Sequence, residues 1–148
     1  MHREWIVPAD PDSIRVVRSG VGDYARDEGL SLGIVSKVKL AVSEVVTNAI
    51  VHGYRGKPGT ITVRAEVDDR LMVTVIDHGG GFLPRDESPG IGAGLQVVRK
   101  LAASLEIGTP PGDNGNGAEV RMTFPLAATA CRASISPEPR VPLNQRSP

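Results

Sequence analysis

The sequence predicts an α+β domain of two layers, in which a mixed, mostly antiparallel sheet carries its helices on one face. Three observations lead to this fold class. Two runs rich in β-branched residues, 60–67 and 71–77, flank a short polar turn and predict an antiparallel hairpin. Two longer segments before them repeat apolar residues at helical spacing. The order strand, helix, helix, strand, strand, helix, strand, strand then places hairpins beside helices, which is typical of a sheet covered on one side.

The first elements are a short strand at 4–7 and two helices. Asp10-Pro11-Asp12 supplies an N-cap and a first-turn proline for the first helix, whose apolar stripe consists of Ile14, Val17, Val21 and Ala25. The second helix begins near Ser31 or Ser36 and runs to Tyr54, because Gly53 and Gly56 are stop signals. It is the longest helix that the sequence predicts.

The later elements follow a polar, proline-broken loop after residue 82. A helix is expected over about 94–105, and strand-like runs are expected at 104–107 and 118–126. Residues 127–148 are rich in Pro, Ser and Arg and have no hydrophobic period, so we expect a disordered tail there. We expect residues 1–126 to form a single domain.

Composition excludes several classes of function. The chain has 148 residues, and its 17 Lys and Arg residues balance 17 Asp and Glu residues, so bulk charge draws it to neither nucleic acid nor an anionic membrane. The single Cys131 excludes an intramolecular disulfide and a multi-cysteine metal site, which fits a reducing compartment. No segment reaches the roughly 20 apolar residues that span a bilayer. We therefore expect a cytoplasmic protein that contacts neither membrane nor nucleic acid directly.

A polar stripe crosses the otherwise apolar second helix. Glu44, Asn48 and His52 recur every four residues, so they share one face of the helix. The stripe either lies at the solvent edge or is satisfied by a ligand or another part of the protein, because an unpaired buried carboxylate costs several kcal/mol. The near absence of other charges on this helix favours the second interpretation.

Two glycine-rich segments form the second candidate constellation. The pattern Asp77-X-Gly79-X-Gly81 follows a strand, and the pattern Gly90-X-Gly92-X-Gly94-Leu95 opens a helix. Backbone N–H groups at a helix N-terminus bind phosphate, so the second segment predicts a phosphate site. The P-loop pattern is absent from the sequence, no GXGXXG follows the first strand of a βαβ unit, and the motifs of eukaryotic-type protein kinases are missing.

In this order and spacing, the motifs resemble the ATP site of the GHKL superfamily, which includes gyrase, the ninety-kilodalton heat-shock chaperone, MutL and histidine kinases. The segments SEVVTNAIVHGY, VIDHGGGF, GAGLQVVRKLA and VRMTFPL are most similar to those of bacterial anti-sigma-factor serine/threonine protein kinases. The resemblance covers about residues 3–126. It implies ATP and Mg²⁺ as cofactors, a sigma factor and a small anti-sigma-factor antagonist as protein partners, and a possible homodimer.

The resemblance also implies roles for individual residues. Glu44 would be the general base and Asn48 would give its side-chain oxygen to Mg²⁺. Asp77 would accept a hydrogen bond from the adenine amino group, while Gly79 and Gly81 would let the chain pass close to the base. The phosphates would be faced by a further set on the glycine-rich segment, namely Gly90, Gly92, Gly94 and the amide of Leu95.

One departure from the family pattern bears on activity. The last strand of the superfamily commonly opens with Gly-Thr, whereas this chain has Gly117-Ala118. Losing one hydrogen bond typically costs about 1 kcal/mol, roughly a fivefold change in affinity. The alternative function is therefore a nucleotide-binding switch module without catalysis. A third interpretation, the detached catalytic domain of a histidine kinase, is less favoured because no phosphoacceptor-histidine segment precedes the domain in this sequence.

Overall fold

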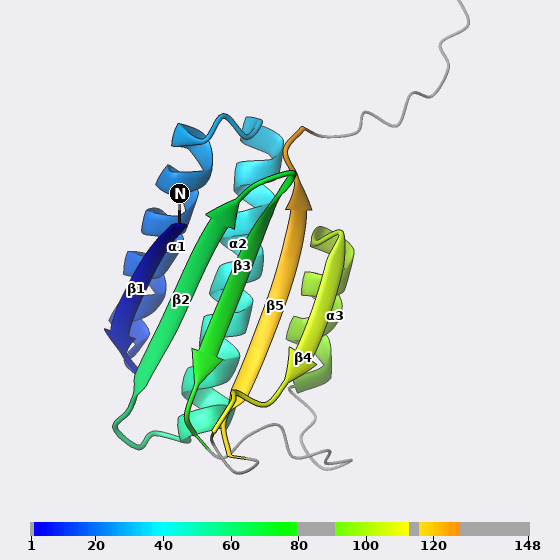
Figure 1. Ribbon diagram of the computed structural model, residues 1–148. Helices are drawn as coiled ribbons and strands as arrows, with labels where there is room; N and C mark the ends of the chain where they lie inside the picture. The colour runs from blue at the N-terminus through cyan, green and yellow to red at the C-terminus, as the bar shows by residue number, and fades with distance from the viewer. Residues whose placement is uncertain (1, 80–90, 113–115, 128–148) are drawn as a thin grey trace, which may run out of the picture.

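The structure, a computed structural model, describes residues 2–79, 91–112 and 116–127 (Figure 1). Within these residues the strands form one five-stranded sheet in the order β1-β2-β3-β5-β4. Every neighbouring pair in it is antiparallel. The strands are β1 (His2–Pro8), β2 (Thr60–Val67), β3 (Arg70–Asp77), β4 (Ser104–Gly108) and β5 (Ala118–Pro125). The central strand β3 therefore ends at Asp77 with β2 on one side and β5 on the other.

The helices cover one face of this sheet, which confirms the predicted two-layer α+β fold (Figure 1). They are α1 (Pro11–Asp27), α2 (Leu32–Asn48), the π-helix η1 (Ala49–Tyr54), which continues α2, and α3 (Ile91–Leu101). The Asp10 side chain accepts a hydrogen bond from the Asp12 N–H at 2.8 Å and caps α1. The Ser31 hydroxyl caps α2 by accepting from the Ile34 N–H at 3.4 Å. α2 is the central helix, in contact with both α1 and α3.

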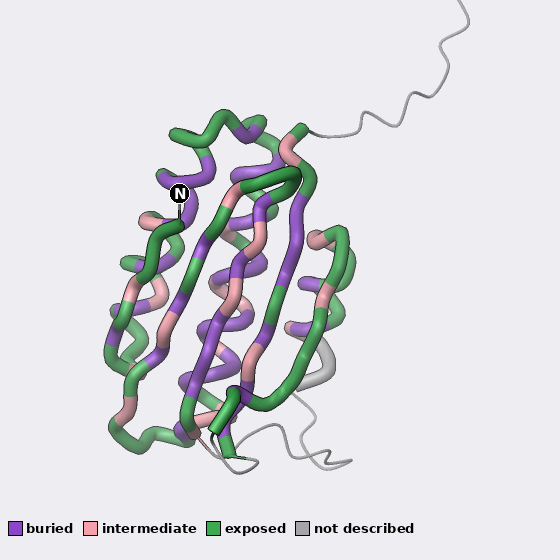
Figure 2. Tube along the Cα trace, viewed as in Figure 1, coloured by how far each residue is buried: buried purple, intermediate pink, exposed green. Residues whose placement is uncertain are grey.

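The core lies between α2 and the inner face of the sheet. Alternate residues of β2 and β3 point inward, as the burial along both strands shows (Figure 2). The inward side chains include Ile61, Val63, Leu71 and Val73, all with no exposed surface. From α2 they meet Val38, Val42 and Val46, which are also fully buried. This packing fixes the position of α2 relative to the end of β3.

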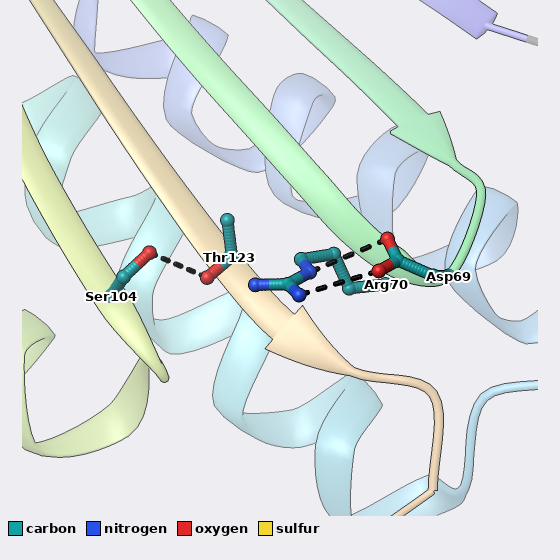
Figure 3. A network of polar contacts seen from close by, with 4 residues as sticks. All are labelled: Asp69, Arg70, Ser104 and Thr123. Atoms are coloured by element: carbon teal, nitrogen blue, oxygen red, sulfur yellow. Dashed lines mark hydrogen bonds and ion pairs between the residues drawn. The ribbon is translucent and has the colours of Figure 1, made fainter.

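The other face of the sheet carries polar pairs. Arg64 on β2 pairs with Glu4 on β1, and Arg121 on β5 lies 3.7 Å from Glu106 on β4. The Ser104 and Thr123 hydroxyls are hydrogen-bonded at 2.6 Å between β4 and β5, on the strands shown in Figure 3. Exposed ion pairs contribute little, about 0–1 kcal/mol each. The fold therefore depends on the buried face, and the functional residues lie at the end of the sheet where β3 stops.

Some boundaries differ from the sequence prediction. α3 begins at Ile91 and ends at Leu101, so it starts before Gly94 and stops before the strand at 104. The second helix begins after Ser31 and reaches Tyr54, but its last six residues are a π-helix. The tail predicted from residue 127 lies, beyond that residue, outside the described part of the chain. No helix within the described ranges is long and apolar enough to cross a membrane.

Candidate active site

The first part of the candidate site is a pair of polar side chains on α2. Glu44 and Asn48 lie one turn apart on the same face of the helix. Glu44 is half-buried, and Asn48 is buried with 8% of its surface exposed. The burial of Asn48 argues against an ordinary solvated face at its end of the stripe, whereas Glu44 keeps part of its surface in solvent.

Gly94 brings the first turns of α3 against this pair. A Cβ placed on Gly94 would lie 3.1 Å from Glu44 Oε2 and 3.3 Å from Asn48 Nδ2. Such contacts are tighter than nearly all real Cβ contacts, so the close approach depends on glycine at this position. Two segments about fifty residues apart in the sequence thus meet where the N-terminal end of α3 reaches α2.

The structure describes only some of the other glycine-rich residues that the sequence predicts for the site. Gly92 lies in the first turn of α3, and Leu95 follows Gly94 with only 9% of its surface exposed. The Leu95 side chain is therefore packed inward, and only its backbone N–H is available for the predicted role. Gly81 and Gly90 lie outside the described residues.

The Asn48 carboxamide is buried without being satisfied. Its Nδ2 has no hydrogen-bond partner among the residues that the structure describes. A buried polar group left without a partner costs about 1–3 kcal/mol, and native proteins hold few of them. Within the described ranges no three His, Cys, Asp or Glu side chains gather as a metal cluster. The unpartnered atom is an N–H donor, which suits an acceptor such as a phosphate oxygen. The atom of this carboxamide that could hold Mg²⁺ is its oxygen, and Mg²⁺ needs only one or two protein ligands when phosphates and water supply the rest.

The second part of the candidate site surrounds Asp77 at the end of β3. Asp77 is buried with 4% of its surface exposed, and its Oδ1 accepts a hydrogen bond from the Gly79 N–H at 3.0 Å. This local bond turns the chain away from the strand, as is common for aspartate in turns. The structure therefore places a carboxylate at the floor of the site, in a fixed orientation.

The π-helix η1 is packed directly against this turn. A Cβ on Gly53 would lie 3.0 Å from Asp77 Oδ1, and a Cβ on Gly79 would lie 2.2 Å from the Gly53 carbonyl oxygen. A Cβ at position 79 would meet the backbone of Gly53, so there is no room for a side chain there, whereas a Cβ at position 53 would require the Asp77 carboxylate to shift. The close neighbour that requires glycine at position 79 is thus the end of the helix. π-Turns of this kind occur often at functional sites, where they re-aim a few residues.

The strand β5 completes the surroundings of Asp77. The Gly117 N–H donates to the Gly79 carbonyl oxygen at 2.9 Å, and Gly117 has a φ of 85°, in the left-handed region that favours glycine. Ala118 then pairs with Asp77 in the register of β3 and β5 and is 2% exposed. The departure from Gly-Thr noted in the sequence therefore lies immediately beside the carboxylate.

Tyr54 is a contact residue that sequence reasoning missed. Its hydroxyl accepts a hydrogen bond from the His78 N–H at 2.9 Å and donates to the Thr60 carbonyl oxygen. The sequence treats Tyr54 only as the last residue of a helix. No local pattern signals that its ring reaches across to the end of β3.

A pocket of about 420 Å³ opens beside this turn. It is lined by Gly53, Tyr54, Arg55, Lys57, Pro58, His78 and Gly79. The pocket borders the Asp77 end of the site and does not extend to Glu44, Asn48 and Gly94. Glu44 and Asn48 are instead linked to the Asp77 turn by one continuous helical segment, α2 and η1, along which Glu44 and Gly53 lie roughly 13 Å apart at 1.5 Å per residue.

The chain is similar in sequence to curated proteins. An "Anti-sigma F factor" of Caldanaerobacter subterraneus subsp. tengcongensis is 35% identical over 118 residues, covering 72% of this chain and 80% of the relative. A "Serine-protein kinase RsbW" of Bacillus licheniformis is 37% identical over 87 residues, covering 57% of this chain. That alignment spans 54% of the kinase, about half of its length.

Solved structures share the fold. The RsbU and RsbW domains of a Mycobacterium tuberculosis protein match with a TM-score of 0.65 and 21% identity, over 85% of this chain and 32% of that chain. The mycobacterial sensor histidine kinase MprB matches with a TM-score of 0.53 and 20% identity, over 80% of this chain and 97% of that chain. At this level of identity the likeness concerns the fold alone.

A family model for the histidine kinase-like ATPase domain matches residues 7–124. This range contains the candidate site residues on five elements, namely α2, η1, β3, α3 and β5. It also contains most of the described chain. The protein belongs to the histidine kinase-like ATPase domain family.

Proposed function

We propose that the protein is an ATP-dependent serine/threonine protein kinase that acts as an anti-sigma factor and phosphorylates a small anti-sigma-factor antagonist. Relatives named anti-sigma F factor and serine-protein kinase RsbW support this function. The observation that carries it is the contact of Gly94 with both Glu44 and Asn48, because it joins a helix N-terminus to a carboxylate and an amide. Phosphoryl transfer depends on positioning a base and groups that bind the phosphates and the metal ion close to one another.

The nucleotide is held at its two ends by different elements. Asp77 accepts a hydrogen bond from the adenine amino group at the floor of the site, and the N–H groups at the start of α3, around Gly92, Gly94 and Leu95, face the phosphates. The Asn48 side-chain oxygen would hold Mg²⁺, which would supply positive charge to offset that of the phosphates. Gly81 and Gly90 belong to the same set by the family motif.

Glu44 performs the proton transfer. The hydroxyl oxygen of a serine or threonine attacks the γ-phosphorus, the bond from that phosphorus to the bridging oxygen of ADP breaks, and the hydroxyl proton passes to the Glu44 carboxylate. The half-buried position of Glu44 beside the N-terminal end of α3, where the phosphates are proposed to bind, supports this role. The products are ADP and a phosphoserine or phosphothreonine on the antagonist.

The test of this function is phosphate transfer with Mg-ATP and the antagonist. Glu44→Gln keeps the shape of the side chain and removes its basicity, so we expect transfer to fall by about 10²–10⁴-fold while ATP binding is retained. Glu28→Gln is the matched control, because Glu28 is exposed at the end of α1. Transfer that is equal in Glu44→Gln and in the wild type removes Glu44 from the role of base.

A second candidate function rests on Ala118. A site without the usual threonine hydroxyl beside Asp77 also suits a switch module, in which ATP or ADP only sets the affinity for a partner protein. Sigma-factor binding that responds to nucleotide, with no phosphoprotein formed over hours, selects this alternative.

The setting of the protein follows from the same proposal. ATP, a sigma factor and an antagonist place it in the cytoplasm, and residues 1–126 form its ATP-binding domain with 127–148 as a tail. We also propose a homodimer, as the family resemblance implies. Sedimentation of the full chain tests the dimer independently of phosphate transfer.

A further inference from the structure

Tyr54 is held rigidly at the end of η1. Its side chain is buried, with 7% of its surface exposed, and its ring lies over Gly59. A Cβ on Gly59 would lie 2.0 Å from the Tyr54 Cε1 atom, so the ring occupies the space that a side chain at position 59 would need. The ring therefore fills this space, and hydrogen bonds of its hydroxyl with two backbone groups hold it there.

The hydroxyl of Tyr54 connects two strands. It donates its hydrogen to the carbonyl oxygen of Thr60, the first residue of β2, and it accepts the N–H of His78, the residue after β3. A phenol has one hydrogen to donate and lone pairs that accept, so both bonds are made at once. The end of β3 is thereby tied to the start of β2 through a side chain from the helix layer.

These bonds act on the residue that follows Asp77 directly. The His78 peptide lies between Asp77 and Gly79, whose N–H donates to Asp77 Oδ1 and whose carbonyl accepts from Gly117. Gly53, which precedes Tyr54, lies against the same carboxylate, because a Cβ added to it would be 3.0 Å from Asp77 Oδ1. The turn is thus held from η1, from within itself and from the residue before β5.

We propose that Tyr54 is a positioning residue that sets the discrimination of this site for a nucleobase bearing a 6-amino group. It does so by fixing the peptide after Asp77 and hence the direction of the Asp77 carboxylate. This inference rests on the proposed role of Asp77 in adenine recognition. A carboxylate held in one orientation by the two strands favours a base with a 6-amino group over a base without one. A misdirected carboxylate would make a poorer hydrogen bond to that amino group, so this preference would decrease.

The variant that tests this is Tyr54→Phe, which keeps the ring over Gly59 and removes only the hydroxyl. The matched control is Tyr24→Phe, since Tyr24 is the other tyrosine of the chain and is also buried. Tyr24 lies against Trp5 and Arg3, and its pKa is raised chiefly by burial. These contacts are at the far end of the sheet from Asp77, so both variants lose a buried phenol but only one lies at the site.

The measurement is calorimetric binding of Mg-ATP and of the 5′-triphosphate of purine riboside, which lacks the 6-amino group. We expect Tyr54→Phe to weaken ATP binding about fivefold and to leave the analogue unchanged, so that the ratio of the two affinities falls about fivefold. Tyr24→Phe should keep the wild-type ratio. An equal loss for both nucleotides, or an unchanged ratio, overturns the inference and leaves Tyr54 with a structural role only.

A measurement on the wild type covers the case in which Tyr54→Phe does not fold. Coupling is reciprocal, so a base that binds Asp77 should also stabilise the hydrogen bond from His78 to Tyr54. We expect hydrogen exchange of the His78 amide to slow more with saturating ATP than with the saturating analogue. Equal slowing by both overturns the inference. A wild type that binds both nucleotides equally contradicts the role of Asp77 itself, which is a failure of the proposed function instead.

Discussion

Asp77 and Ala118 face each other across the adjacent antiparallel strands β3 and β5. Directly opposed residues of an antiparallel pair lie on the same face of the sheet, with Cβ atoms about 4.5–5.5 Å apart. The methyl group of Ala118 therefore borders the carboxylate that is proposed to recognise adenine. A hydroxyl at this position would be within reach of the same base.

Ala118→Thr should accordingly tighten ATP binding. One added hydrogen bond corresponds to about fivefold in affinity. Ala118→Val is the matched control, because valine has the shape of threonine without the hydroxyl and so measures the cost of filling this buried position. Calorimetry with Mg-ATP compares the two. If threonine binds ATP no better than valine does, position 118 has no part in holding the base.

Gly53→Ala should weaken ATP binding while leaving the core intact. Its new methyl group would lie 3.0 Å from Asp77 Oδ1 and displace the carboxylate. Loss of a hydrogen bond to a charged group predicts a decrease of about tenfold in affinity. Gly33→Ala is the control, because Gly33 lies in the first turn of α2 with no other atom within 4 Å of its Cβ position. Equal ATP affinities for the two variants would contradict the contact.

Gly94→Ala should slow phosphate transfer. The new methyl group would lie 3.1 Å from Glu44 Oε2 and 3.3 Å from Asn48 Nδ2, so both side chains would have to shift. Alanine favours the helix by roughly 0.5–1 kcal/mol relative to glycine, and this contact offsets that gain, so stability should change little. Thermal unfolding and a transfer assay on one preparation measure both effects. Unchanged transfer in a folded variant would show that Glu44 and Asn48 have room to move without loss of function.

Asn48→Ala and Asp77→Asn should weaken ATP binding in different ways. Asn48→Ala removes the proposed Mg²⁺ ligand, so its affinity should fall about tenfold with Mg²⁺ and little in EDTA. Asp77→Asn removes the carboxylate and should weaken binding under both conditions. Calorimetric titrations with and without Mg²⁺ separate the two residues. The site assignment fails if the wild type and both variants bind alike.

Much of this fold follows from local patterns. The hairpin strands lie where β-branched residues predict them, and the caps at Asp10 and Ser31 begin α1 and α2 as expected. The sequence predicts the start of α3 near Gly94, whereas the helix begins at Ile91. Gly92 and Gly94 therefore lie inside a helix, despite the low helix propensity of glycine, in an element that is in contact with α2.

The remaining differences come from contacts between distant parts of the chain. The sequence predicts residues 104 and 105 in both a helix and a strand. In the structure they belong to the strand, because β4 pairs with β5. The π-helical form of residues 49–54 has no local signal in the sequence, and in this form Gly53 lies against Asp77. Glu44 and Asn48 could be predicted as a pair from their spacing, whereas the bonds of Tyr54 to Thr60 and His78 have no local signal.

The continuity of α2 with η1 has a consequence for the tolerance of the chain to length changes. The proposed proton transfer at Glu44 and the proposed base recognition beside Gly53 lie along a single helical segment, so their separation is set by the number of residues between them. One residue inserted or deleted between Asn48 and Gly53 would rotate one end against the other by about 100° and shift it by about 1.5 Å. Loops can absorb such changes, but this segment cannot, and its length should be as invariant in functional variants as any of its side chains.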